Sequence, residues 1–201
     1  AHPYSQSSCV LWRKEGGRIA LSHHNYDAGY CDPTDPWDMT RARTAGILQY
    51  WKDRFDENGR LLYFAPILGL RNSRQVAGDY SLKFSDEICG REFDDVVAYS
   101  YSHYDNHASD SESESVEAMF WCWGLGMWGT LIGCEIPYRT MLPAGIANML
   151  VACRALSMDF DAHNQMRMMR DMQRTGEAAG IAAALSSKMK TRPRNLDVKR
   201  L

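Results

Sequence analysis

Residues 136–188 constrain the fold most, because a short apolar run is followed there by small residues at helical spacing. Residues 148–152 predict a short buried strand, since they are apolar and are bounded by glycine, proline and arginine. Residues 175–185 predict a helix in which glycine and alanine recur three to four positions apart. Such a face lets the backbone approach a neighbour closely, and the N–H groups that start a helix attract negative charge. This order of elements suits an anionic cofactor.

Composition limits the partners of this chain. Its 201 residues, 45% of them hydrophobic, can bury the core of one domain or of two lobes that share one. The net charge of −2 gives no reason to expect nucleic acid. No apolar run approaches the roughly 20 residues that span a bilayer, so we expect no membrane segment. We interpret the basic tail, residues 188–200, as a solvated surface segment.

The cysteines argue against a metal site. All six are scattered and form no CxxC pair, whereas zinc ligands usually come in close pairs. The even number permits disulfides, but a chain with a real core does not need them. We therefore favour reduced, mostly buried thiols and expect a cytoplasmic location.

Two segments near the start have clear local patterns. Short apolar runs on either side of Gly16 and Gly17 predict a strand hairpin. Asp35 or Thr34 is suited to cap a helix with Pro36 in its first turn, and an amphipathic pattern follows. Residues 105–117, rich in acids and serine, are expected to form an exposed loop.

A glycine-rich stretch invites a nucleotide-binding interpretation. Residues 124–129 match the spacing of a dinucleotide-binding glycine loop, which works only between a strand and a helix. The residues that follow contain Gly133 and Pro137 and have the composition of another strand. We therefore favour a glycine-containing hairpin within residues 118–142.

The order and spacing of many polar and small residues are similar to those of a known family. In the last third they are Tyr138, Arg139, Pro143, Asn148, Arg154, His163, Arg167, Gly176, Ala178, Ala179 and Gly180. Weaker matches are Gly69, Arg71, Arg74, Gly78, Asp79, Tyr80, Asp105 and His107. With these residues the chain resembles the C-terminal portion of the bacterial FAD-dependent oxidoreductases of the two-dinucleotide-binding-domain type.

This resemblance implies an α/β, or mixed α+β, fold. It consists of an antiparallel substrate-domain sheet plus the last strand and the C-terminal helix of an FAD-binding domain. Residues 1–142 would form the substrate lobe and residues 143–201 the flavin segment. The implied activity is hydride transfer between a small organic substrate and the cofactor FAD. Because the family's N-terminal glycine-loop unit has no counterpart here, the resemblance also implies a separate N-terminal FAD-binding half or subunit as partner.

The resemblance also assigns site residues. The cofactor-binding candidates are Asn148, Cys153, Arg154, Arg167, Gly176, Glu177, Ala178, Ala179 and Gly180. Catalytic candidates are His107, His163 and Arg139, and substrate-binding candidates are Arg71 and Arg74, because imidazole titrates near neutral pH and guanidinium binds carboxylates. Surface salt bridges and structural histidines are the alternatives.

One residue departs from the family pattern. Cys153 stands where the family usually has glycine, and its side chain would crowd a flavin. This departure leaves open a second function, a non-catalytic binding or assembly module with a decayed flavin site.

Overall fold

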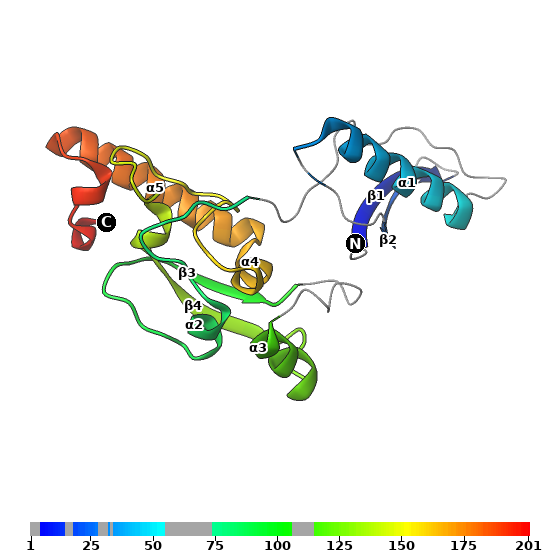
Figure 1. Cartoon of the computed structure of the whole chain (residues 1–201), viewed down its shortest axis with the longest axis horizontal. Helices are drawn as coiled ribbons and strands as arrows, with labels where there is room; N and C mark the ends of the chain where they lie inside the picture. Colours follow the sequence, from blue (N-terminus) through cyan, green and yellow to red (C-terminus); the bar gives the residue numbers. More distant parts are fainter. Residues whose placement is uncertain (1–4, 15–17, 28–31, 33, 55–73, 106–114) are drawn as a thin grey trace. The chain divides into compact units, whose positions relative to one another are not determined.

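A computed structural model of the chain describes residues 5–14, 18–27, 32, 34–54, 74–105 and 115–201 (Figure 1). The chain forms two compact units, and the second comprises Asn72–Asn106 and Glu114–Leu201. No helix among the described residues is long and apolar enough to cross a membrane.

The first unit contains a strand hairpin and a long helix. Strands β1 (Ser5–Lys14) and β2 (Arg18–Asp27) pair in antiparallel fashion over their whole length. Helix α1 (Pro36–Arg54) begins after Asp35, whose carboxylate accepts a hydrogen bond of 2.9 Å from the backbone N–H of Trp37. A carboxylate in this position satisfies a free N–H group of the first turn. The predicted hairpin and the predicted helix start are confirmed.

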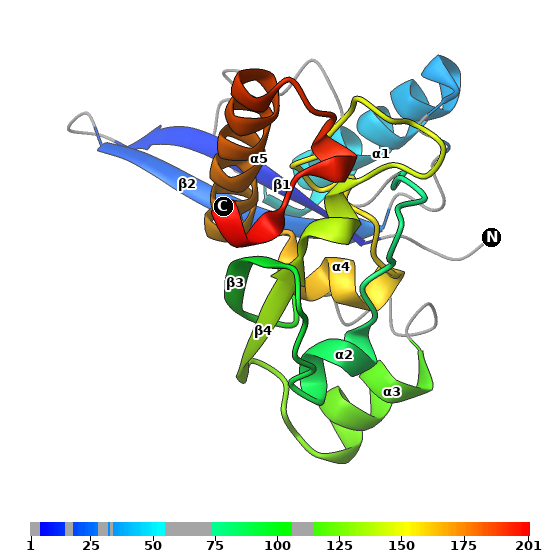
Figure 2. The same cartoon turned by 90° about the vertical axis from the view of Figure 1, so that its left-hand side faces the viewer.

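The second unit is built around a two-stranded antiparallel ribbon, β3 (Val96–His103) and β4 (Leu131–Pro137). Its α-helices are α2 (Phe84–Ile88), α3 (Val116–Met119), α4 (Phe160–Met166) and α5 (Met169–Met189). Helix α5 packs against β3, whereas α2 packs against β4, α3 and α4 (Figures 1 and 2). The predicted α/β class with an antiparallel sheet is confirmed.

The main core of the second unit lies between the ribbon and helices α4 and α5. Its fully buried side chains include Leu82, Ile136, Tyr138, Met141, Leu156, Met166 and Ala182. Burial of Met166 agrees with the packing role expected of methionine. Because these residues come from segments distant in sequence, the core holds the C-terminal third against the ribbon.

The strand predicted at residues 148–152 is wrong. The segment has no strand structure. The N–H of Val151 donates a hydrogen bond of 2.9 Å to the carbonyl of Met141, the last residue of a 3-10 turn (Tyr138–Met141). A strand needs a neighbouring strand for its backbone groups, and no strand pairs with this segment in the described part of the chain. Apolar composition alone therefore did not produce a strand.

The start predicted for the last helix is also wrong. Helix α5 begins at Met169 rather than Thr175, because residues 169–174 are mostly good helix formers. The hydroxyl of Thr175 donates to the carbonyl of Met172 at 3.0 Å, as a residue inside a helix does. Gly176 accordingly lies about two turns from the start, where N–H groups are already paired.

The glycine-rich stretch forms a turn between a helix and a strand. Ser115 caps α3 by accepting from the N–H of Ala118 at 3.1 Å, and a π-helical turn (Phe120–Gly124) extends it. Gly126 and Gly129 have φ angles of 66° and 80°, which favour glycine, and β4 follows. The predicted hairpin is wrong here, and the strand–loop–helix order of a dinucleotide loop is absent at these residues.

The boundary predicted between residues 142 and 143 lies inside the second unit. Division into a substrate lobe and a flavin segment stays a prediction. The acidic loop predicted at residues 105–117 falls mostly outside the described residues.

Candidate functional site

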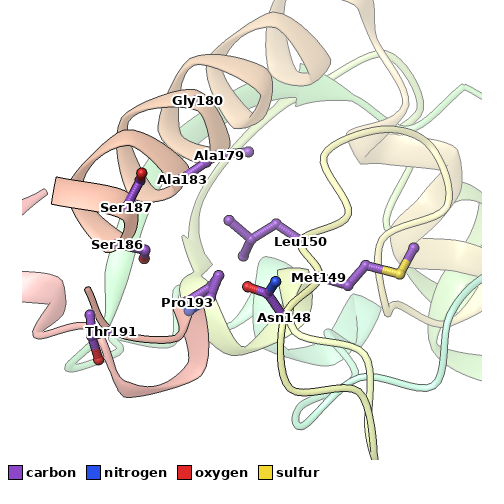
Figure 3. A pocket seen from close by; sticks show the side chains of 10 residues that line it. All are labelled: Asn148, Met149, Leu150, Ala179, Gly180, Ala183, Ser186, Ser187, Thr191 and Pro193. Carbon is purple, nitrogen blue, oxygen red and sulfur yellow. The ribbon is translucent and has the colours of Figure 1, made fainter. Parts of the chain in front are cut away.

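A groove of about 560 Å³ lies beside α5 in the second unit (Figure 3). Three segments form its walls: the loop at residues 148–150, the C-terminal half of α5, and the tail that follows it. The lining residues are Asn148, Met149, Leu150, Ala179, Gly180, Ala183, Ser186, Ser187, Thr191 and Pro193.

Small residues keep the helix wall of the groove open. Ala179, Gly180, Ala183 and Ser187 follow one another at helical spacing on one face of α5. A Cβ placed on Gly180 would meet no atom within 4 Å. Leu150 reaches into the space between the loop and this face (Figure 3). A flat or extended ligand can therefore approach the helix backbone closely.

The tail wall is held by specific hydrogen bonds. Tyr138 donates its hydroxyl hydrogen to the carbonyl of Pro193 at 3.0 Å. Arg194 forms an ion pair with Asp79 and donates to the carbonyls of Pro143 at 2.6 Å and Ile146 at 3.2 Å. The interpretation of the tail as a solvated segment is therefore wrong at Arg194, which ties the tail to the loop.

Ser186 supplies a polar group with no partner in the described part of the chain. The residue lines the groove, is only 4% exposed, and its hydroxyl makes no hydrogen bond there. Buried polar groups are almost always hydrogen-bonded in folded proteins. This orphaned hydroxyl is therefore suited to a ligand that enters the groove.

Three of the predicted cofactor residues meet in the groove: Asn148, Ala179 and Gly180. Glu177 and Ala178 line a different groove of about 300 Å³, where α5 faces β3. Gly176 is exposed and lines neither groove. The structure thus divides the predicted glycine–alanine motif between two sides of one helix.

The remaining cofactor candidates lie away from the groove. Cys153 and Arg154 are exposed on a loop, and the Cys153 sulfur accepts from the N–H of Ala155 at 3.4 Å. Arg167 is buried, forms an ion pair with Asp105 at 3.7 Å, and donates to the carbonyl of that residue. Cys153 therefore does not crowd this groove.

The catalytic and substrate candidates do not converge. Arg139 binds Asp95 through two guanidinium nitrogens, Nε at 3.0 Å and Nη2 at 2.9 Å, and lies over the ring of Tyr80 at 5.5 Å. These hydrogen bonds to Asp95 raise the pKa of Arg139. The guanidinium nitrogens that would bind a substrate carboxylate are therefore already hydrogen-bonded to the carboxylate of Asp95.

The other candidates are dispersed. His163 is 1% exposed in the last turn of α4, and Arg74 is exposed. Arg71 and His107 lie outside the described residues. Among the cysteines whose side chains the structure describes, Cys122 and Cys134 are buried and Cys89 and Cys153 are exposed, and all four are free thiols. No cluster of three metal-ligating side chains occurs within those ranges.

Sequence reasoning missed the far half of the groove. Ser186, Ser187, Thr191 and Pro193 were not predicted as site residues. The small-residue pattern that includes Ala179 and Ala183 continues to Ser186 and Ser187 at the same spacing, and following it past residue 185 would have identified both serines.

Comparison with known proteins gave one match. The family model described as FAD dependent oxidoreductase matches residues 14–201, which is nearly the whole chain. A search of curated proteins and a search of solved structures found no match.

Proposed function

Because this chain belongs to the FAD dependent oxidoreductase family, we propose that it is the C-terminal portion of a bacterial flavoprotein and borders the flavin. The proposed reaction moves a hydride between a small organic substrate and the cofactor. Bound FAD would supply this chemistry by accepting or donating the hydride at its N5 atom. The residues of this chain would supply binding, orientation and exclusion of water.

The observation that carries the proposal is the meeting of Asn148 with Ala179 and Gly180 in one groove. The residues fit a flat, polar-edged group: the helix wall is open at Gly180, and Ser186 offers a buried, unpartnered hydroxyl. In this proposal Asn148 and Ser186 hydrogen-bond the cofactor, and Leu150 excludes water from its face.

The proposal includes a partner that completes the cofactor site. The backbone of residues 148–150 has no hydrogen-bond partner among the described residues, so an added strand is able to pair with it. A pyrophosphate-binding loop is followed by a helix, but the glycine-rich turn at residues 124–129 is followed by strand β4. We therefore assign the pyrophosphate-binding loop to an N-terminal FAD-binding half or subunit.

We propose separate roles for the other candidates. Arg74 is exposed and suited to attract an anionic substrate, and we pair it with Arg71 from the sequence alone. Arg139 is hydrogen-bonded to Asp95 and His163 is buried, so we propose that they position other groups. His107 is proposed from the family pattern alone, and so are Cys153, Arg154, Arg167 and Glu177 as flavin neighbours.

Flavin retention tests the proposal. The purified chain is titrated with FAD, alone and together with any co-purifying FAD-binding half, and absorbance near 450 nm and flavin fluorescence are recorded. We expect retained flavin when both parts are present. Ala183→Leu fills the groove and should weaken FAD binding by about tenfold or more, which corresponds to about 1.4 kcal/mol.

A matched variant separates groove filling from damage to the helix. Ala184→Leu alters the neighbouring exposed position of α5, which does not line the groove, and should leave FAD binding unchanged. Equal losses in both variants would contradict the assignment of the groove. If the folded, paired chain never retains flavin, the oxidoreductase proposal fails and the assembly-module alternative is supported.

A further inference from the structure

Glu87 is a buried acid that no part of the proposed flavin site uses. It lies on the short helix α2, and its side chain is 1% exposed. Both of its carboxylate oxygens are without a hydrogen-bond partner in the described part of the chain. Carboxylates are almost never fully buried unless they are paired, because removing an unpaired charge from water is very costly.

The neighbouring acids have hydrogen-bond donors, in contrast to Glu87. Asp159 accepts from the N–H groups of Phe84 and Ala162 at 3.2 and 2.8 Å. Asp171 accepts from the hydroxyl of Ser102 at 2.6 Å.

The two remaining acids also accept hydrogen bonds. Asp161 accepts from the hydroxyl of Tyr104 at 2.8 Å and from the N–H of Ser115 at 3.0 Å. Asp86, on α2 itself, accepts from Tyr80 and pairs with Arg91 at 3.0 Å. The nearby donors are thus directed to other carboxylates.

Both carboxylate oxygens of Glu87 also lack an ion-pair partner in the described part of the chain. Helix α2 packs against β4, α3 and α4. Their titratable side chains are Cys134 and Glu135 on β4, Glu117 on α3, and Asp161 and His163 on α4. On the α2 side, Lys83 is exposed, and Arg91 is engaged by Asp86.

Burial is the main cause of a pKa for Glu87 well above its ordinary value. The negative charges of Asp159, Asp86, Asp161 and Asp171 raise it further. A raised pKa means that the protonated, neutral form of this carboxyl is favoured in the interior, which avoids the cost of a buried charge.

We propose that Glu87 is a proton-operated lock that holds α2 in the second unit. With its proton, the neutral carboxyl stays in the interior and α2 stays packed against β4 and α4. Without the proton, the charged side chain moves toward water and α2 separates from these elements. Release of α2 also frees Asp86, whose bonds to Tyr80 and Arg91 lie beside Arg139.

The direction of the pH effect follows from proton linkage. A folded-state pKa above the unfolded value means that the folded chain holds more protons between the two values. Stability from Glu87 is therefore fully present below the unfolded pKa and is lost as pH rises toward the folded pKa. An ordinary hydrogen-bonded carboxylate gives the opposite dependence.

Hydrogen exchange on the full chain tests the lock. Amide exchange of residues 84–91, corrected for the intrinsic effect of pH, is measured from about pH 5 to about pH 9 by mass spectrometry. We expect exchange in α2 to accelerate by up to about tenfold per pH unit over the interval between the unfolded and the folded pKa of Glu87, with β1 and β2 unaffected. Corrected α2 exchange that stays constant across this range would overturn the proposal.

Variants assign the effect to this carboxyl. Glu87→Gln keeps the shape without an ionisable proton, and its corrected α2 exchange should not change with pH. Glu92→Gln, at an exposed position nearby, should behave as the wild type does. The same acceleration in Glu87→Gln would overturn the proposal, and the wild-type profile tests it even if that variant fails to fold. Flavin retention plays no part in the result.

Discussion

One arginine side chain joins three segments of the second unit. Arg194 reaches the carboxylate of Asp79 and the carbonyls of Pro143 and Ile146. A planar guanidinium with several fixed donors is suited to such a junction, because each acceptor takes a separate N–H group. Arg192, two residues earlier, is exposed, so neighbouring arginines of the basic tail have different roles.

We expect Arg194→Ala to lower the free energy of unfolding by about 1–3 kcal/mol, because charge-assisted hydrogen bonds to Asp79 and to the carbonyls of Pro143 and Ile146 are lost. Arg192→Ala should change it by less than about 0.5 kcal/mol. Urea denaturation followed by circular dichroism measures both. Similar effects of the two substitutions would show that the tail is not held by Arg194.

At the scale of elements, α5 presents two different faces. Ala178, Ala182 and Ser186 are buried, whereas Gly176 and Gly180 are exposed. The buried residues face the interior of the second unit, whereas the exposed small residues border the groove or solvent. A helix with this division is suited to approach a second structural element or a ligand closely.

Glycine substitutions distinguish open from crowded positions. A Cβ at Gly176 would meet no atom within 4 Å, so Gly176→Ala should stabilise the chain by about 0.5–1 kcal/mol through higher helix propensity. A Cβ at Gly78 would come within 2.7 Å of the Cβ of Ser157, so Gly78→Ala should destabilise it. Thermal unfolding of both variants measures the difference, and equal signs would contradict the arrangement described here.

At the scale of the molecule, the core of the second unit joins sequence-distant segments. Ile136 on β4 is completely buried, and it belongs to one core with the buried side chains of Leu82, Leu156 and Leu196. Contacts of this kind form only when the whole unit folds, so removal of one buried side chain affects several elements together.

We expect Ile136→Ala to lower the free energy of unfolding of the second unit by about 2–5 kcal/mol, through lost burial and a cavity. Hydrogen exchange should accelerate together in β3, β4 and α5. Val116→Ala removes an exposed side chain and should have little effect. Acceleration confined to β4 would argue against one cooperative core.

Local sequence rules predicted elements whose determinants are local. The hairpin around Gly16 and Gly17 depends on apolar runs beside a turn, and the start of α1 depends on the carboxylate of Asp35. The same rules failed at residues 148–152, because a strand depends on a partner that the segment itself does not encode. They also placed the start of α5 too late, since the glycine motif was given more weight than the helix formers before it.

The amino-acid sequence by itself determined the α/β class, the family, and the small-residue pattern of the last helix, because each depends on residue type and spacing. Only the tertiary structure decided that Asn148, Ala179 and Gly180 share a groove while Glu177 faces another. It also decided that the side chain of Asp86 is hydrogen-bonded while that of Glu87 has no partner in the described part of the chain, although the two residues are adjacent. Burial and hydrogen bonding depend on which distant segments surround a side chain, and local patterns do not specify those neighbours.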